Sequence, residues 1–180
     1  MKKVLLHSCC APCSGAIIEW MLANDIQPVI FFSNSNITPL EEYEKRKAEC
    51  ERYAQKMGVE MVADSYDHED WKKIAAGLED APERGPRCLK CFKYRLERAA
   101  KYAEANGFDC LTTSLASSRW KSLEQVDEAG LEVCSKTPDV EWWAKNWRKG
   151  GLQERRNQII KEQNFYNQTF CGCEFSKKNL

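Results

Sequence analysis

Residues 4–13, which read VLLHSCCAPC, decide the fold. A short apolar run over 4–7 is followed by the polar, small-residue stretch 8–15, and then by apolar residues at helical spacing over 17–22. This order predicts a buried strand, a loop and a helix. Three thiols lie within five residues directly after the strand, and no packing role requires such a group.

The same alternation continues along the chain. Further strands are predicted at 27–32, 59–63, 110–116 and 140–143. Helices are predicted from a capping box at Thr38 to Gly58, around Trp71 and Ile74, from Cys88 to Asn106, and over 122–133 and 152–163. Strands that alternate with helices predict an α/β fold, a three-layer sandwich with a mostly parallel sheet. Such sheets bind ligands beyond the carboxyl ends of their strands, so we expect a site at the loops after the first and fourth strands.

Composition narrows the class of protein. The 180 residues suit one domain over 1–180 with a Cys-Gly-Cys segment near its C-terminus. No apolar run is long enough for a membrane span or a signal-peptide core, so we expect a cytoplasmic protein with no membrane partner. The 27 basic and 27 acidic residues cancel, so any contact with a nucleic acid must be local. Ten cysteines without a secretory signal should be reduced thiols, which points to metal binding or catalysis.

Two thiol groups have metal-ligand spacing. Cys10 and Cys13 form one C-x-x-C, and Cys88 and Cys91 form another at a predicted helix start, where the helix dipole and flanking cations favour thiolates. Four thiolates suit zinc or an iron–sulfur cluster. Zinc ribbons keep their pairs roughly 15–20 residues apart, so the wide separation here favours a cluster. Zinc, and dithiol chemistry without a metal, remain alternatives.

A third thiol group, Cys171-Gly172-Cys173, lies near the C-terminus. A disulfide in so small a ring is strained and therefore labile, which favours a redox role. A third ligand pair or two unrelated thiols are the alternatives. The remaining cysteines are expected to be small buried hydrophobes without a function: Cys50, Cys110 and Cys134.

A basic window and one histidine complete the candidates. Residues 142–161 hold six cations against the single anion Glu154, and Trp142, Trp143 and Trp147 alternate with them. This mixture could stack bases and hold phosphates, and packing of the aromatic rings in the core explains it equally well. The cations we expect to contact RNA are Arg148, Lys149, Arg155 and Arg156. His7 abuts the thiol loop, and it could equally end the first strand with hydrogen bonds to its neighbours.

Together the stretches HSCCAPC, RCLKCFKYRLERAA, GFDCLTTSLASS and FYNQTFCGCEFS resemble the QueH-type epoxyqueuosine reductases, in the family's order and over nearly the whole chain. The resemblance implies an oxidoreductase that reduces epoxyqueuosine to queuosine at the wobble position of transfer RNA, without cobalamin. It also implies a fold similar to the adenine-nucleotide hydrolase type. The partners would be transfer RNA carrying epoxyqueuosine and an unidentified electron donor.

The resemblance further implies roles for individual cysteines. The 4Fe-4S ligands would be Cys9, Cys10, Cys88 and Cys91, whereas spacing alone prefers Cys10 and Cys13 in the first loop. Cys13 would be a ligand for an adjacent mononuclear iron. Cys171 and Cys173 would be the redox-active pair. An iron with an open coordination position could act as a Lewis acid on the epoxide oxygen.

Two other classes of protein are alternatives to a reductase. An ATP-dependent enzyme of RNA thiolation would share the fold, but the loop after the first strand reads HSCC and lacks a phosphate-binding pattern of the S-G-G-x-D-S kind. A zinc-stabilised RNA-binding module without catalysis would be colourless.

Overall fold

The computed structural model describes residues 1–176, so the last four residues of the predicted domain lie outside it. Its centre is a five-stranded sheet in the order β3-β2-β1-β4-β5 with every neighbouring pair parallel. The strands are β1 (Val4–Ser8), β2 (Val29–Phe32), β3 (Glu60–Ala63), β4 (Cys110–Thr113) and β5 (Glu141–Trp142). This is the doubly wound order, in which β1 and β4 flank the point where the connections reverse direction. The predicted α/β class is confirmed.

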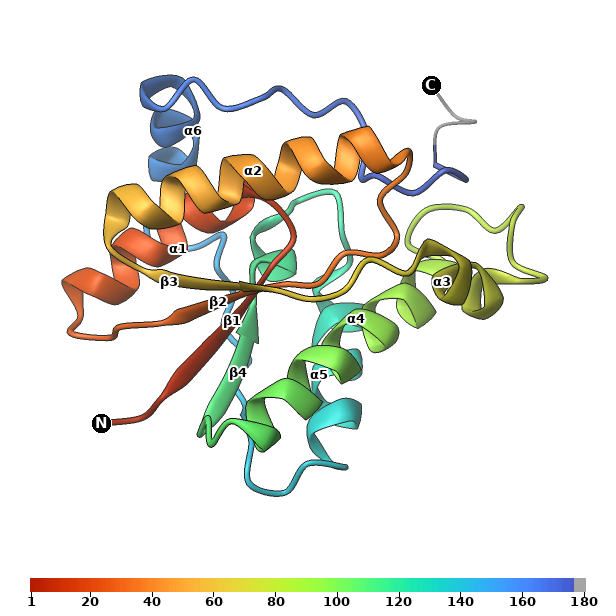
Figure 1. Cartoon of the computed structure of the whole chain (residues 1–180), viewed down its shortest axis with the longest axis horizontal. Coiled ribbons are helices and arrows are strands. Elements are labelled where there is room, and N and C mark those ends of the chain that lie inside the picture. The colour runs from red at the N-terminus through yellow and green to blue at the C-terminus, as the bar shows by residue number, and fades with distance from the viewer. Residues whose placement is uncertain (177–180) are drawn as a thin grey trace.

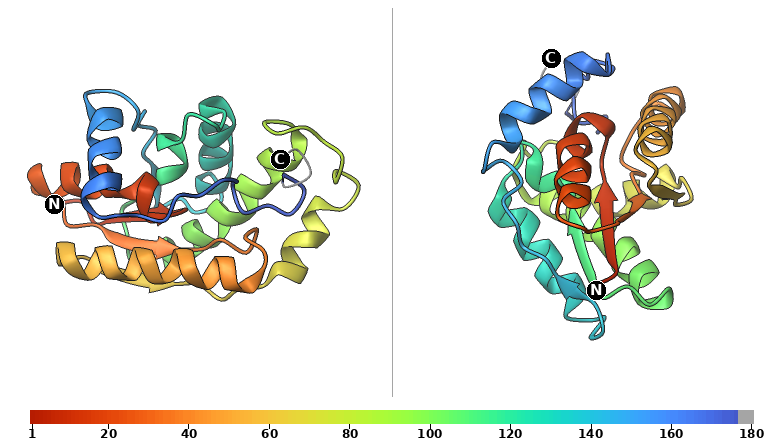
Figure 2. Two further views of the ribbon diagram at one scale, coloured as in Figure 1. Left: turned by 90° about the horizontal axis from the view of Figure 1, so that it is seen from above. Right: turned by 90° about the vertical axis from the view of Figure 1, so that its left-hand side faces the viewer.

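Helices cover both faces of the sheet (Figures 1 and 2). On one face α1 packs against α2 and α6, and on the other α4 packs against α5, with α3 beside α4. The helices are α1 (Ala11–Ala23), α2 (Leu40–Met57), α3 (His68–Ala75), α4 (Pro86–Ala105), α5 (Leu123–Cys134) and α6 (Leu152–Glu162), and a 3-10 helix, η1, spans Ser114–Ser117. Across residues 1–176, no helix has the length and apolar character needed to cross a membrane.

The first strand forms the centre of the core, as its apolar run predicts. All five residues of β1 are buried, and Leu5 and Leu6 are fully inaccessible. A strand with helices on both sides has no solvent-facing side, so its residues are continuously apolar until the chain leaves the sheet. The change to polar and thiol residues after His7 therefore marks the carboxyl edge of the sheet.

Two element boundaries differ from the sequence prediction near this edge. The loop predicted over 8–15 is short, because α1 begins at Ala11 and its first turn contains Pro12 and Cys13. Proline suits a first helical turn, whose N–H groups have no partner within the helix. The fourth strand ends at Thr113, where the chain tightens into η1 and the Thr113 hydroxyl accepts the N–H of Leu115 at 3.1 Å.

The predicted capping box at Thr38 is wrong. The residue that precedes α2 is Pro39, and no side chain of the described residues caps the first turn. The N–H of Thr38 instead donates to the carbonyl of Gly172 at 3.0 Å, so this corner binds the C-terminal segment. The predicted end of α2 is confirmed, since Gly58 adopts the left-handed conformation that terminates a helix.

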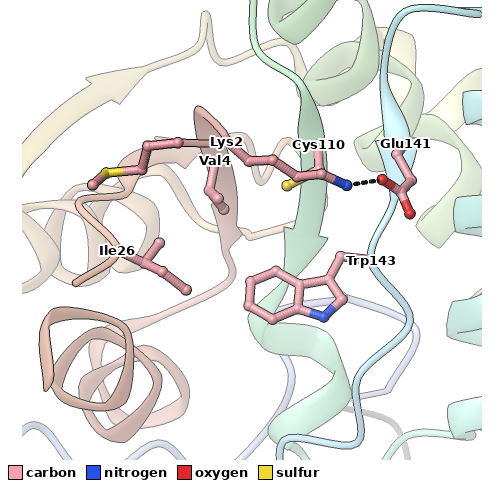
Figure 3. Close-up of a pocket in the computed structure, with 7 residues that line it drawn as sticks. Lys2, Val4, Ile26, Cys110, Glu141 and Trp143 are labelled. Atoms are coloured by element: carbon pink, nitrogen blue, oxygen red, sulfur yellow. Dashed lines mark hydrogen bonds and ion pairs between the residues drawn. The ribbon is translucent and has the colours of Figure 1, made fainter. Parts of the chain in front are cut away.

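A small hollow lies at the opposite, amino edge of the sheet (Figure 3). It has a volume of about 310 Å³ and is lined by the first residues of three strands, Val4, Cys110 and Glu141. Lys2 and Glu141 form an exposed ion pair across it. Burial raises the pKa of the Cys110 thiol to about 11, so this cysteine is a protonated thiol at neutral pH and offers no nucleophile.

Candidate metal and substrate site

The large cavity of the molecule, about 720 Å³, opens at the carboxyl ends of the strands. It is bounded by the segment after β1, the segment after η1, the first turns of α4 and the C-terminal segment. Seven of the ten cysteines line it: Cys9, Cys10, Cys13, Cys88, Cys91, Cys171 and Cys173. The topology therefore gathers all three thiol groups of the sequence in one place, and the three cysteines predicted to lack a function lie outside its lining.

The thiols that follow β1 form a compact triad. The Sγ atoms of Cys9, Cys10 and Cys13 lie within 4.8 Å of one another, and all three residues are buried. The Cys9 N–H donates to the Ser114 hydroxyl at 2.9 Å, and that hydroxyl lies 3.2 Å from the Cys9 Sγ. Hydrogen bonds from the thiols of Cys10 and Cys13 lower the pKa of Cys9 well below its ordinary value. The triad can hold a metal ion or form part of an iron–sulfur site.

The second thiol pair approaches from α4. The helix begins at Pro86, two residues before its predicted start at Cys88, so Cys88 is the third helical residue and Cys91 the sixth. Against the thiolate expected at the helix start, burial raises the pKa of the Cys88 thiol. The side chain of Arg87, a predicted flanking cation, instead turns to the carbonyls of Leu78, Glu79 and Ala81. A thiol with a raised pKa becomes a thiolate when it binds a metal.

The C-terminal segment brings the third pair to the same cavity. Cys171 is exposed within the cavity and Cys173 is buried. A hydrogen bond from Cys173 lowers the pKa of Cys171 well below its ordinary value, and the same contact raises that of Cys173. Gly172 has φ +102°, and a Cβ there would lie 2.8 Å from Ile37 Cγ1, so both the backbone conformation and the space require glycine.

Buried cations surround the thiols. Arg87 and Arg95 are only 1% and 3% exposed, and neither forms an ion pair with a carboxylate within residues 1–176. Arg95 donates to Asn34 Oδ1 at 2.6 Å and to Cys91 Sγ at 3.8 Å, while its Nε has no hydrogen-bond partner among the residues that the structure describes. A buried charge without a counter-charge is costly. A thiolate-ligated cluster, which carries net negative charge, would supply that counter-charge, so these residues fit the group.

The cavity lining is strongly basic although the chain as a whole is neutral. Seven basic residues line it against the single acid Glu83: Arg46, Arg84, Arg87, Arg95, Arg119, Lys121 and Arg156. Only Arg156 among them comes from the basic window that the sequence singled out. A local surplus of this kind attracts a polyanion to the cavity mouth.

The four cations predicted to contact RNA have different surroundings. Arg156 lines the cavity, with Nη2 4.0 Å from Cys13 Sγ, and Lys149 is exposed. Arg155 pairs with Glu19 through two contacts of 2.7 Å and also with Glu162. Arg148 donates to the backbone carbonyls of Ser118 and Lys121. Within residues 1–176, the side chains of Arg156 and Lys149 have no carboxylate or carbonyl partner, and the RNA contact stays a prediction.

The aromatic residues of the basic window pack inward. Trp142 and Trp147 are buried, and Trp147 packs edge-on against Trp20 and Trp143. Core packing, one of the two interpretations of this pattern, therefore holds for Trp142 and Trp147. Sequence reasoning missed Trp120, which is 69% exposed and lines the cavity. Its only signal in the sequence was its place just after the fourth strand.

His7 has a structural place. It is fully buried, its Nε2–H donates to the carbonyl of Ser33 at 2.9 Å, and its Nδ1 accepts from the Thr113 hydroxyl at 2.9 Å. Burial and then the charge of Arg95 lower its pKa to about 4, so the ring is neutral. His7 joins the ends of β1, β2 and β4 below the thiols, which is the second of the two roles that the sequence left open.

Comparison with known proteins decides the family. The family model described as epoxyqueuosine reductase QueH matches residues 4–179. The chain belongs to the QueH family. Epoxyqueuosine reductase QueH of Histophilus somni is 47% identical over 178 residues, which cover 99% of this chain and 73% of that relative. The QueH protein of Acinetobacter baylyi is 46% identical, over 98% of this chain and 81% of that relative.

Membership of the QueH family confirms the resemblance drawn from the motifs, and it makes the chain an oxidoreductase. The two alternative classes, a thiolation enzyme and a non-catalytic zinc module, are set aside. A solved structure described as a predicted subunit of tRNA methyltransferase from Methanocaldococcus jannaschii has a TM-score of 0.57. It covers 94% of both chains at 13% identity, and it supports the fold alone.

Proposed function

We propose that this chain reduces epoxyqueuosine to queuosine at the wobble position of transfer RNA, with a 4Fe-4S cluster bound in the thiol-lined cavity. The observation that carries this proposal is the convergence of seven cysteines and seven basic residues on one cavity in a member of the QueH family. Removal of the epoxide oxygen as water takes up two electrons and two protons and leaves an alkene. A site for this reaction therefore needs both a redox group and access for a nucleotide.

The cluster ligands in this proposal are Cys9, Cys10, Cys88 and Cys91. Cys13, whose Sγ belongs to the compact triad, would be a ligand for an adjacent mononuclear iron. The bound iron–sulfur group supplies single electrons, and an iron with an open position supplies Lewis acidity. The buried arginines beside the pair on α4 balance the negative charge that four thiolates bring.

The chain's own residues bind and orient the substrate. The basic lining attracts the RNA backbone, and the depth of the cavity brings the modified base to the buried thiols. A cavity of about 720 Å³ is within the range of sites for small molecules. The buried Arg87 and Arg95 hold positive charge beside the thiols, where the epoxide oxygen gains negative charge as its bond to carbon breaks.

Cys171 and Cys173 are the redox-active pair of the proposal. Oxidation of the two thiols to a disulfide releases two electrons and two protons, the amounts that the reduction of the epoxide consumes. A cytosolic dithiol or a flavin-dependent reductase, the class of donor required, would then return the pair to the thiol form. We place the reaction in the cytoplasm, where such thiols stay reduced.

Anaerobic metal analysis and absorption spectroscopy test the cofactor. Iron and sulfide with a broad charge-transfer absorption are expected, and single substitution of Cys9, Cys10, Cys88 or Cys91 to Ser should abolish that absorption. Cys50→Ser is the matched control, because Cys50 is buried outside the cavity lining. Stoichiometric zinc without the absorption would contradict the assignment.

The redox pair has a separate test in the double substitution of Cys171 and Cys173 to Ser. The cluster absorption should persist, and multiple-turnover conversion of epoxyqueuosine in transfer RNA should fall. The single-turnover rate should fall too, because the two thiols supply the electrons of each turnover. If the variant matched the parent in both the single-turnover and the multiple-turnover rate, the pair would have no part in turnover. Loss of the cluster would instead make the pair part of the metal site.

A further inference from the structure

Trp120 has an unusual place for a large apolar side chain. The large hydrophobic residues that are exposed within the described chain are Met1, Leu40, Trp120 and Leu131, and only Trp120 lines the thiol cavity. Single exposed hydrophobic residues are ordinary on protein surfaces. An exposed indole at the mouth of a basic cavity is different, because aromatic rings at such positions stack on the bases of single-stranded nucleic acids.

The backbone around Trp120 is fixed by two guanidinium groups. Arg84 donates from Nε to the Trp120 carbonyl at 3.0 Å and from Nη2 to the Arg119 carbonyl at 2.7 Å. Arg148 donates to the Lys121 carbonyl at 2.8 Å. These bonds hold the segment in place before any ligand binds, so the ring needs little ordering on binding.

One face of the Trp120 ring is already occupied. The guanidinium carbon of Arg119 lies 5.2 Å from the ring centroid, in cation–π geometry. No other ring contact of Trp120 occurs among residues 1–176, and the residue is 69% exposed. The exposed surface of the ring is therefore available to a planar partner. Arg119 beside it supplies the positive charge that the phosphate of the same nucleotide requires.

We propose that Trp120 stacks on a nucleobase adjacent to the modified nucleotide of the RNA substrate, with Arg119 beside its phosphate. This inference rests on the proposed function, which supplies the RNA. The partner is a neighbouring base because Trp120 is 69% exposed, whereas Cys9, Cys10 and Cys91, which the modified base must approach as proposed cluster ligands, are buried. Two adjacent bases thus bind at different depths of one cavity.

The test compares Trp120→Ala, Trp120→Phe and the parent protein, each loaded with its metal group. Fluorescence anisotropy with a labelled anticodon stem-loop RNA bearing epoxyqueuosine gives Kd. The alanine variant should raise Kd about five- to a hundredfold, the range found when a stacking residue is removed. The phenylalanine variant, which keeps a ring, should stay within about threefold of the parent. Leu131→Ala is the control for loss of an exposed apolar side chain outside the cavity, and it should leave Kd unchanged.

A second measurement identifies the base. Kd is measured for the parent and for Trp120→Ala with two stem-loops, each of which lacks one of the two bases that flank the modified nucleotide. At the flank that stacks, loss of the base should weaken binding to the parent and should have no further effect on the variant, because both changes remove the same contact. Additive effects at both flanks would overturn the proposal.

The free modified nucleoside separates this proposal from others. Trp120→Ala should raise KM for the stem-loop and leave KM for the nucleoside unchanged. An equal loss for both substrates would mean that the ring stacks on the modified base itself, which contradicts the assignment to a neighbour. If the parent binds and reduces the stem-loop and Trp120→Ala behaves identically, only the stacking proposal fails. If the parent neither binds nor reduces it, the proposed function fails first.

Discussion

The guanidinium Nη1 of Arg95 lies 3.8 Å from the Sγ of Cys91, one helical turn earlier on α4. Both residues are buried, and Arg95 reaches across to Asn34 in the segment that follows β2. This contact joins the second thiol pair to the carboxyl edge of the sheet. It also places a positive charge against a sulfur that we propose as a cluster ligand. Hydrogen bonds to such sulfurs tune the reduction potential of a cluster.

Replacement of Arg95 by Gln should make the cluster harder to reduce, because a positive charge beside it is removed. We expect the potential to become more negative by about 50–100 mV, corresponding to roughly 1–2 kcal/mol for a one-electron couple. Anaerobic spectroelectrochemistry measures the shift. Arg95→Lys should recover part of it, and Lys101→Gln, at an exposed position of the same helix, should not change the potential. An unchanged potential in Arg95→Gln would refute the tuning role.

Replacement of Gly172 by Ala should displace the Cys171 and Cys173 pair. The added Cβ would lie 2.8 Å from Ile37 at φ +102°, so the segment must move. Strain of this kind costs about 1–3 kcal/mol. We expect steady-state turnover to fall about tenfold, the effect of roughly 1.4 kcal/mol on a barrier, with the cluster absorption intact.

The matched control for Gly172 is Gly107→Ala. Gly107 also has positive φ, +66°, but nothing lies within 4 Å of a Cβ there, and it is not part of the cavity lining. Its substitution should lower thermal stability without a change in turnover. Equal turnover in the two variants would show that the position of the C-terminal pair does not limit the reaction.

Asp64 should make stability depend on pH. Burial raises the pKa of its carboxyl, but hydrogen bonds from Arg98 and Ser33 outweigh burial and hold the pKa below its ordinary value. The folded state therefore binds its proton at lower pH than the unfolded state. The resulting stability is present above the unfolded pKa, about 4, and is lost as pH falls through the folded pKa.

Urea unfolding of Asp64→Asn from pH 7 to pH 3 measures this contribution. The variant should be less stable than the parent by about 1–3 kcal/mol at pH 7, as expected for a hydrogen bond to a charged group. The difference should narrow below about pH 4. Asp139→Asn, at an exposed position, should match the parent throughout. A difference that stays constant with pH would exclude the carboxylate as its source.

The basic residues should divide into those that contact RNA and those that hold the fold. Arg156→Ala and Lys149→Ala should weaken transfer RNA binding. Each should also reduce the slope of log K against log salt concentration by about 0.7, the value for one lost contact with a single-stranded phosphate. Arg155→Ala should lower stability with an unchanged slope, because its guanidinium is already paired with Glu19. Titrations of RNA binding at several salt concentrations measure this slope for each variant. A changed slope in Arg155→Ala alone would contradict the division.

The sequence by itself determined the fold class and the chemistry of the site. The buried run before His7 and the alternation of strands and helices predicted a parallel sheet, because strands covered on both sides must be continuously apolar. Thiol spacing and order then marked the QueH family. These signals are local, so they can be identified along the chain without knowledge of its contacts.

The tertiary structure alone decided which residues share a surface. In the basic window 142–161, Arg148 and Arg155 are bound to other parts of the chain. The basic cavity is instead lined by residues from distant segments, among them Arg84 and Arg95. The thiols of the C-terminal segment reach the others only because the chain after α6 runs back alongside α2 (Figure 1). Packing and the paths of loops bring together residues that are more than a hundred positions apart in the sequence, such as His7 and Thr113. The periodicity of residue types along the chain does not indicate which distant residues meet.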